Sequence, residues 1–395
     1  MRLLVAQTEE GLISLAQRFS LEQLKLWKKE KQFYCPSCQS PVQLKVGTKK
    51  IPHFAHLKKT CVAQHEGETD YHLDGKRKLF HWFSSHLEVE LESYLPDIMQ
   101  RPDLLVDTPS QKYAIEFQCA SLSSSALTKR SIHYEKGNYM PLWIMGAKRM
   151  KRLSTYMYQL SFQEWQFLTL SDYTPTLLYF SPSTNQLLKL EHLIPFSSQI
   201  CYAQLVVLSP HEHTFHDLFS THTQPQFFSS WIKKKKAWRT HYILYPNQKL
   251  QPFLHALYEN NIPPSHIPAE AGMPLPSLYM VETSGIIWQT WLLLDLIQQK
   301  QVGDLVTEKE LGRLWLYRIH KRHIVFRSLP MAPVAVEQPL FEYIEVLCRL
   351  GMLTYITSGV YKIRRPYTIP KQTSDAFLED GQMMKRWLNQ AKEVT

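Results

Sequence analysis

The 395-residue sequence lacks the features that define membrane, secreted and disordered proteins. Its apolar runs are short or interrupted, as at Ile286–Leu294, and none approaches the ~20 residues of a membrane-spanning helix. Charged residues occur within the first ten positions, where a signal peptide would need an apolar segment. Glycine is scarce, with 13 residues, and no low-complexity tract is present. We therefore expect a folded, cytoplasmic protein without a membrane span.

Cysteine is also scarce, and its distribution is uneven. Six cysteines are too few for a disulfide scaffold in a chain of this length, and three of them fall within residues 35–61. In a reducing compartment, such a concentration favours metal binding over disulfide formation.

Acidic residues are fewer than basic ones, 35 against 45, and the net charge is +10. A positive protein attracts polyanions, because neutralised phosphates release their counterions. Two of the basic clusters contain a tryptophan, Trp27 and Trp238, that could stack on bases. The alternative is that the clusters are ordinary solvated surface. They are Lys25–Lys31, Lys148–Arg152, Lys233–Arg239 and Arg318–Arg327.

The length exceeds what one compact core usually holds, so we expect an α/β (mixed α+β) protein of several domains. We expect an N-terminal region at residues 1–64, a strongly patterned domain at 65–150, linking strands and irregular structure at 151–280, and a helical domain at 281–395. The third region begins with an expected helix at Met150–Asp172. Its expected strands are Leu177–Phe180, Leu187–Leu190 and Tyr202–Leu208.

The C-terminal domain carries helix signals followed by a hairpin. Thr307 and Glu310 form a capping box, which predicts a helix start, and Gly351 predicts a helix end. The hairpin is followed by Arg364 and Arg365. This order resembles a winged helix, a fold that binds DNA in some proteins and packs against other proteins elsewhere. The expected elements are helices at Ser284–Gln299, Lys309–His320 and Pro339–Arg349, and strands at Leu353–Ile356 and Val360–Ile363.

The cysteine-rich segment has the spacing of a zinc site. Cys35 and Cys38 form a C-x-x-C turn, and His53, His56 and Cys61 follow. Such a turn places two thiolates on one side of a knuckle, and a later histidine and cysteine complete a tetrahedral site. We expect Cys35, Cys38, His56 and Cys61 as zinc ligands, with His53 either replacing His56 or supporting it by a hydrogen bond. Four protein ligands leave no open position, so this zinc is expected to be structural.

A β-hairpin carries the candidate catalytic acids. Pro109 occupies a favourable place in its turn. Centring the turn there pairs Asp107 with Lys112, and counting outward along both strands pairs Asp103 with Glu116. Directly opposed residues share a face of the sheet, with Cβ atoms ~4.5–5.5 Å apart.

Two facing carboxylates repel each other unless a cation lies between them. Mg²⁺ or Mn²⁺ is the natural occupant, because these hard cations take carboxylate oxygens and water. Such an ion activates water and offsets charge on a phosphodiester. Gln118 lies on the same face as Glu116, two residues further on. The hairpin therefore predicts a metal-dependent nuclease site with Asp103 and Glu116 as metal ligands.

The flanking segments extend this pattern. Glu68, His72 and Lys76 are spaced by four residues and line one face of a predicted helix. A later helix carries Arg130 and Tyr134 on one face. The order is helix, three strands, helix, strand. The elements around the hairpin are the helix His65–Leu87, the strand Val89–Leu95, the helix Ser121–Lys136 and the strand Pro141–Met145.

This order, with its two acids, resembles the PD-(D/E)xK nuclease superfamily and, more narrowly, the competence protein CoiA family. The resemblance implies a restriction-endonuclease-like αβββαβ core and a role in natural transformation, acting on incoming DNA or supporting its recombination. The implied partners are DNA, single-stranded in preference to double-stranded, and recombination proteins. The motifs lie within residues 30–146 and are CPSC, HFAH, ETDYH with a lysine four residues later, RPDLLV, AIEFQCA and a final R-x-x-x-Y.

The resemblance also implies roles for individual residues. Asp103 and Glu116 would hold the metal, and Glu68 and His72 would lie at the edge of the catalytic site. Arg130 and Tyr134 would contact DNA phosphate.

One position departs from the superfamily pattern, which has a lysine where this chain has Gln118. Lysine supplies a positive charge that stabilises the transition state, whereas glutamine supplies only hydrogen bonds. Lys76 could provide that charge from the helix or contact DNA. Two hypotheses follow: a DNA nuclease that hydrolyses phosphodiesters, and a non-catalytic DNA-binding protein that supports recombination. A zinc-finger regulator is a third, which leaves the hairpin unexplained.

Overall fold

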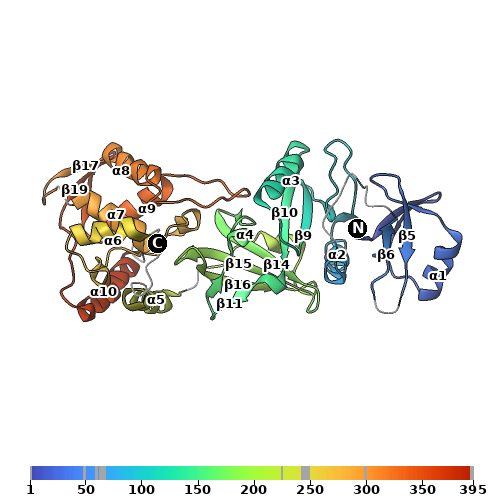
Figure 1. The fold of residues 1–395 in the computed structure, drawn as a ribbon, viewed down its shortest axis with the longest axis horizontal. Helices are drawn as coiled ribbons and strands as arrows, with labels where there is room; N and C mark the ends of the chain where they lie inside the picture. The colour runs from blue at the N-terminus through green and yellow to red at the C-terminus, as the bar shows by residue number, and fades with distance from the viewer. Residues whose placement is uncertain are drawn as a thin grey trace.

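The computed structural model describes residues 2–47, 50–57, 61, 68–223, 226–241, 250–297 and 300–391. Three parts follow one another along the long axis of the molecule (Figure 1): a small N-terminal sheet, a large central sheet flanked by helices, and a helical C-terminal domain. The mixed α/β, multi-domain architecture expected from the sequence is confirmed. Among the described helices, none combines the length and the apolarity of a membrane span.

The N-terminal module, residues 2–57 with Cys61, is a six-stranded sheet with one helix. The strand order is β1-β6-β5-β4-β2-β3. The hydroxyl of Ser20 accepts a hydrogen bond from the amide of Gln23 and so caps α1. The elements are β1 (Arg2–Leu3), β2 (Val5–Thr8), β3 (Gly11–Ser14), α1 (Leu21–Glu30), β4 (Phe33–Tyr34), β5 (Pro41–Lys45) and β6 (His53–His56).

The central sheet has ten strands in the order β11-β12-β16-β15-β14-β10-β9-β8-β7, with β13 paired to β14. The hairpin register predicted from its turn is confirmed, since Asp107 pairs with Lys112 and Leu104 with Ile115. The elements up to the fourth strand are α2 (Asp70–Phe83), β7 (Glu88–Leu91), β8 (Leu104–Asp107), β9 (Lys112–Gln118), α3 (Ser124–Lys136) and β10 (Tyr139–Gly146).

Helices α2 and α3 cover opposite faces of this sheet, because successive residues of β9 point to opposite sides. On one face, Phe117 packs so closely against α2 that a Cβ atom at Gly75 would lie 2.0 Å from its ring. On the other face, Ser131 of α3 accepts a hydrogen bond from the indole of Trp143 at 3.1 Å. The order of helix, three strands, helix and strand expected for residues 65–150 is present.

Two boundaries of this core differ from expectation. Helix α2 begins at Asp70, with Thr69 as its N-cap, and residues 65–67 of the expected helix lie outside the described part of the chain. Strand β7 ends at Leu91 rather than Leu95, because Glu92 adopts φ of +51° and leaves the extended conformation.

The prediction of a helix at Met150–Asp172 is wrong. This segment forms short strands instead, and its one helix stops after four residues. The hairpin β11–β12 pairs Lys151 with Gln159 at the edge of the central sheet, and that pairing fixes an extended backbone. After η1 (Ala147–Arg149), the segment holds β11 (Lys151–Arg152), β12 (Met157–Gln159), α4 (Phe162–Trp165) and β13 (Thr169–Ser171).

The central sheet continues past residue 150, where the sequence had suggested a domain boundary. Strand β14 pairs in parallel with β10, so later strands extend the same sheet. The three strands expected between residues 177 and 208 are confirmed, with wider bounds. They are β14 (Thr174–Ser181), β15 (Gln186–Pro195) and β16 (Ile200–Leu208), followed by η2 (Phe215–Leu218).

The C-terminal domain confirms the expected helices and hairpin, apart from residues 298–299, which lie outside the described residues. A further strand, β17, joins the hairpin in a sheet of order β17-β19-β18. The elements are α5 (Phe228–His241), α6 (Gln251–Glu259), η5 (Pro264–His266), η6 (Pro276–Met280), α7 (Gly285–Ile297), β17 (Leu305–Thr307), α8 (Glu308–His320), α9 (Gln338–Arg349), β18 (Leu353–Thr357), β19 (Val360–Ile363) and α10 (Thr373–Ala391).

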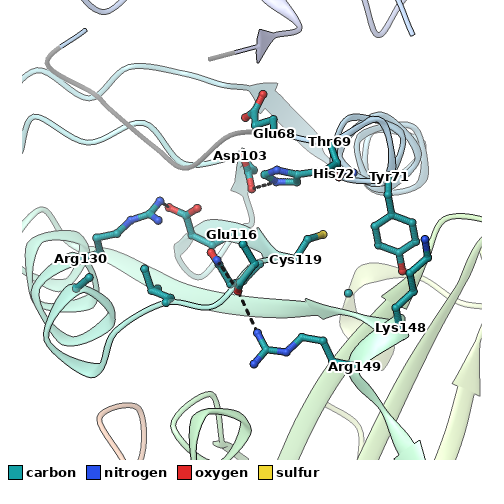
Figure 2. Close-up of a pocket in the computed structure, with 15 residues that line it drawn as sticks. Glu68, Thr69, Tyr71, His72, Asp103, Glu116, Cys119, Arg130, Lys148 and Arg149 are labelled. Carbon is teal, nitrogen blue, oxygen red and sulfur yellow. Dashed lines mark hydrogen bonds and ion pairs between the residues drawn. The ribbon is translucent and has the colours of Figure 1, made fainter. Parts of the chain in front are cut away.

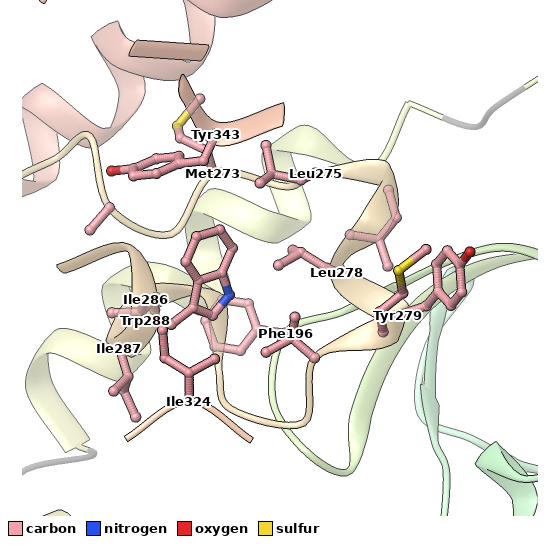
Figure 3. Close-up of a cluster of buried hydrophobic side chains, with 14 of the residues drawn as sticks. Phe196, Met273, Leu275, Leu278, Tyr279, Ile286, Ile287, Trp288, Ile324 and Tyr343 are labelled. Atoms are coloured by element: carbon pink, nitrogen blue, oxygen red, sulfur yellow. The ribbon is translucent and has the colours of Figure 1, made fainter. Parts of the chain in front are cut away.

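One hydrophobic core joins this domain to the central sheet. Trp288 of α7 is fully buried and lies edge-on to Tyr343 of α9, with Phe196 from the end of β15 nearby (Figure 3). Arg327 stacks on Trp165 of α4, 4.0 Å from the ring centre, and donates to the backbone carbonyls of Ser197 and Ser198 between β15 and β16. The two parts therefore pack as a continuous body.

The basic cluster Lys233–Arg239 is only partly on the surface. Lys235 and Arg239 are buried and both form ion pairs with Asp380 of α10. Trp238 is 7% exposed and cannot stack on a base in this structure. Burial in the domain core, rather than contact with a polyanion, accounts for these residues.

Candidate active site

A cavity of about 470 Å³ opens beside the end of the carboxylate hairpin. Figure 2 shows side chains that converge on it from α2, the hairpin, α3 and η1. Of the residues expected at the catalytic site, all but Lys76 and Tyr134 line this cavity. Its lining residues are Glu68, Thr69, Tyr71, His72, Asp103, Glu116, Gln118, Cys119, Ala120, Leu122, Ala126, Arg130, Gly146, Lys148 and Arg149.

Asp103 lies at the centre of the contacts. Its Oδ2 accepts a hydrogen bond from the amide of Phe117 at 2.9 Å and lies 3.2 Å from Nε2 of His72. Its Oδ1 lies 3.5 Å from Nζ of Lys76. Burial alone would raise the pKa of Asp103, but Lys76 and His72 outweigh it and hold the pKa well below its usual range. Asp103 is therefore a carboxylate at neutral pH.

Lys76 is fully buried beneath the cavity, so it does not reach a DNA phosphate in this structure. Its ammonium donates to Glu68 at 2.7 Å and to Glu92 at 2.5 Å. Burial would lower its pKa, but these carboxylates and Asp103 raise it above the ordinary value. The lysine thus supplies a fixed positive charge beside Asp103, from a helix rather than from position 118.

Glu92 is the residue at this site that sequence reasoning missed. It follows β7 directly, is buried, and belongs to none of the motifs. Its contacts with Leu4 and Val5 span more than eighty positions of the chain, so no local pattern could reveal them.

Glu116 is held by the two residues that the resemblance assigned to phosphate contact. Arg130 and the hydroxyl of Tyr134 both donate to its Oε1. Burial raises the pKa of Glu116 more than Arg130 lowers it. Tyr134 is completely buried, so its partner here is this carboxylate rather than DNA.

Three side chains have ligand atoms close enough to share one cation. Atoms of Glu68, His72 and Asp103 lie within 4.8 Å of one another, and Glu116 is not in that group. Oε2 of Glu68 is buried without a hydrogen-bond partner. Burial raises the pKa of Glu68, and Lys76 only partly opposes it. Two carboxylates and one imidazole with an unsatisfied oxygen fit a divalent cation such as Mn²⁺ or Mg²⁺.

Two basic residues lie at the rim of the cavity, on the turn η1 that follows β10. The ammonium of Lys148 lies 4.5 Å from the ring centre of Tyr71. Arg149 donates to the carbonyl of Ala120 at 3.1 Å and to the side chain of Gln163 at 3.3 Å. Both cations are held by neutral or aromatic groups, which leaves their charge available to an anion. The sequence showed them only as a basic cluster.

Gln118 lies at the position where the superfamily has a lysine. Its side-chain nitrogen donates to the carbonyl of Ala120 at 3.0 Å. The neighbouring Cys119 is no substitute nucleophile, because burial raises the pKa of its thiol to about 12.

The N-terminal module holds a second group of ligand atoms. Sγ of Cys35, Cys38 and Cys61 and a ring nitrogen of His56 lie within 4.8 Å of one another. The sulfurs of Cys35 and Cys61 are 4.0 Å apart, close to the roughly 3.8 Å edge of a tetrahedron with zinc–sulfur bonds. His53 is outside the group, and its Nδ1 lies 2.8 Å from the carbonyl of Ile51. The Cys₃His arrangement is consistent with a zinc-binding module.

Comparisons with known proteins agree with this arrangement. Three family models match consecutive segments: the N-terminal domain of competence protein CoiA at residues 16–64, its nuclease-like domain at 68–223 and its C-terminal domain at 227–377. Competence protein CoiA of Bacillus subtilis (strain 168) is 30% identical over 342 residues, which are 86% of this chain and 91% of that protein. No solved structure matches. As its motifs predicted, the chain belongs to the competence protein CoiA family.

Proposed function

We propose that this protein processes incoming DNA in the cytoplasm during natural transformation, by metal-dependent hydrolysis of phosphodiester bonds at the cavity around Asp103. The observation that carries the proposal is the excess of negative charge there. Glu68, Glu92 and Asp103 share the single buried ammonium of Lys76. Glu116 pairs with Arg130. The rim cations Lys148 and Arg149 contact no carboxylate among the described residues. A bound divalent cation would balance this charge.

Asp103, Glu68 and His72 are the residues best placed to hold the cation, with Glu116 as a further carboxylate facing the cavity. When bound, a Mg²⁺ or Mn²⁺ ion would stabilise the negative charge that develops on the phosphate oxygens. Lys76 would keep Asp103 ionised and oriented. Gln118 would orient water by hydrogen bonds, and Arg130 would fix Glu116.

Lys148 and Arg149 would bind the phosphates of the strand on either side of the reacting bond. A cavity of about 470 Å³ suits one nucleotide rather than a duplex, which favours single-stranded DNA as the substrate. Recombination proteins that act on the same strand are the expected protein partners.

The test is cleavage of labelled single-stranded DNA by purified protein with Mn²⁺. Asp103→Ala and Glu116→Ala should abolish cleavage. Asp107→Asn is a matched control, since Asp107 lies at the other end of the same strand and pairs with Lys112 away from the cavity. Equal cleavage by wild type and Asp103→Ala would trace the activity to a contaminant and refute the assignment.

A second candidate function is DNA binding without cleavage, in support of recombination. The absence of lysine at position 118 favours it, as does the arrangement of α7, β17, α8, α9 and the β18–β19 hairpin, which has the element order of a winged helix. It predicts salt-sensitive binding to DNA and no cleavage with any divalent cation. Cleavage lost on Asp103→Ala would rule it out.

We also propose a structural zinc ion in the N-terminal module, held by Cys35, Cys38, His56 and Cys61. The distances among their ligand atoms support it. Elemental analysis should find one zinc per chain, lost on Cys61→Ser and kept on Cys348→Ser, which changes a cysteine of α9 far along the chain.

A further inference from the structure

Glu92 connects two parts of the protein that the family models treat as separate domains. Its Oε2 accepts hydrogen bonds from the backbone amides of Leu4 at 2.9 Å and Val5 at 3.2 Å. Its Oε1 accepts a hydrogen bond from Nζ of Lys76 at 2.5 Å. The residue is 3% exposed, and its φ of +51° is a conformation that side chains other than glycine rarely adopt. Such strained positions often serve function.

The hydrogen bonds from Leu4 and Val5 to Glu92 depend on the structure of the N-terminal module. Leu4 and Val5 lie where β1 passes into β2. Strand β1 pairs with β6, with Leu3 opposite Phe54, and β6 ends at His56 of the Cys₃His group. The two amides are therefore in place only when the strand that carries a metal ligand is in place.

The carboxylate of Glu92 also sets the position of the buried ammonium. Lys76 also donates to Glu68, and its Nζ lies 3.5 Å from Asp103. Three carboxylates thus share one ammonium, and the loss of one partner shifts the balance of the other two. One oxygen of Glu92 accepts hydrogen bonds from the N-terminal module, and the other accepts one from Lys76. A glutamine has only one acceptor oxygen, so at this position it could accept hydrogen bonds from only one of these two partners.

We propose that Glu92 is a positioning residue that couples the folding of the N-terminal module to the placement of Lys76 beside Asp103. The importance of that placement for catalysis rests on the proposed function, but the coupling itself does not. Simple tethering is the competing explanation. Arg2 also ties the module to α2, through an ion pair with Asp70 at 2.5 Å, yet neither residue of that pair contacts Lys76 in the described part of the chain. Asp70→Asn is therefore the matched control.

The experiment follows the Lys76 ammonium directly, by NMR of ¹⁵N-labelled lysine side chains in the full-length protein. A buried ammonium with three carboxylate partners exchanges its protons slowly and gives a visible signal, which Lys76→Arg assigns. In Glu92→Gln we expect its proton exchange to accelerate by at least about tenfold, as loss of a charged hydrogen bond implies. Asp70→Asn should leave the rate within about twofold, because a half-exposed ion pair contributes little.

Removal of zinc from the wild type by a chelator is a second arm that needs no variant. It should accelerate exchange of the Lys76 ammonium as Glu92→Gln does. An unchanged signal in either arm, or an equal effect of Asp70→Asn, would overturn the coupling. A protein that shows the coupling but never cleaves DNA would instead refute the proposed function alone.

Discussion

Two groups of buried charges lie in different parts of this protein, one around Asp103 in the central sheet and one around Asp380 on α10. In the second group, Arg239 donates to both oxygens of Asp380, at 2.8 and 2.7 Å, and Lys235 lies 2.8 Å from the same carboxylate. Further donors of Arg239 and Lys235 reach the backbone carbonyls of Ser265, Ile267 and Ala269.

The two groups differ in the sign of their excess charge and in their access to solvent. Around Asp380, cations outnumber carboxylates, and carbonyl oxygens take up the surplus donors. Beside Asp103, three carboxylates share the single ammonium of Lys76, and one oxygen of Glu68 has no hydrogen-bond partner. The group around Asp380, called the closed group below, holds helices together. The group around Asp103, called the open group below, leaves negative charge that a cation would balance. Buried charge alone does not indicate a functional site. Buried carboxylates that share too few cations beside a cavity do indicate one.

The largest expected effect is on the open group. Glu68→Gln should lower Mn²⁺-dependent cleavage by roughly 10²- to 10³-fold, because a ligand and its charge are lost. Its free energy of unfolding should stay within about 1 kcal/mol of wild type or rise, since the raised pKa of Glu68 means that its ionised form is unfavourable in the folded state.

Cleavage assays and urea unfolding measure the two quantities. Asp74→Asn, on the same helix and paired with Arg77, should change neither. A large loss of stability in Glu68→Gln would place this carboxylate with the closed group.

The next effect is on the closed group. Asp380→Asn should lower the free energy of unfolding of the C-terminal domain by about 3–5 kcal/mol, because it leaves two buried cations without a carboxylate. Urea unfolding followed by tryptophan fluorescence measures this. Glu345→Gln, which removes an exposed carboxylate from α9, should cost less than about 0.5 kcal/mol. If both variants cost the same, the Asp380 group contributes no special stability.

The stabilisation by Asp380 should also depend on pH. Burial would raise its pKa, but Lys235 and Arg239 hold the pKa below the ordinary value. A carboxyl with a lowered pKa stabilises the folded state fully above its unfolded pKa of about 3.9. The stabilisation is then lost progressively as the pH falls from that value through the lower pKa of the folded state. The difference in unfolding free energy between wild type and Asp380→Asn should therefore be constant from pH 7 to about 5 and shrink below about 4. A constant difference down to pH 3 would contradict this origin.

The smallest effect concerns the rim of the open group. Lys148→Gln should weaken binding of single-stranded DNA several-fold and reduce the slope of log affinity against log salt by about 0.7, the value for one phosphate contact. Fluorescence anisotropy at several salt concentrations measures both. Lys233→Gln, in a basic cluster distant from the cavity, should leave the slope unchanged; an equal change would mean that the whole positive surface binds DNA.

The parts of the fold that follow local rules could be predicted from the sequence. The turn at Pro109 determined the register from Asp107–Lys112 to Leu104–Ile115, which ends one position before Asp103 and Glu116. The C-x-x-C spacing identified the cysteine group. The helix expected at Met150–Asp172 failed because pairing at the edge of the sheet overrode its local pattern. The role of Glu92 could not be predicted from the sequence, because its partner Leu4 in the N-terminal module is 88 positions away along the chain.

The roles of charged residues were the least predictable part. Arg130 and Tyr134 were assigned to phosphate by motif, yet their partner in the structure is Glu116. One signal for the buried cations was present in the sequence: Trp231, Lys235 and Trp238 recur at helical spacing, and a stripe of large apolar residues that includes a lysine indicates a buried face.

The close contact between Gly75 and Phe117 bears on the ion selectivity of the proposed metal site. Residue 75 precedes Lys76 and follows His72 by one turn of α2, so the distance between helix and strand determines how near both side chains come to Asp103. A single methyl group at position 75 would push α2 outward and widen the gap between the ligands. Mg²⁺ demands short ligand distances of ~2.0–2.1 Å, while Ca²⁺ accepts ~2.3–2.6 Å. If the proposed metal site is correct, the size of the ion that it accepts would therefore depend on the close approach of α2 to β9 that Gly75 permits.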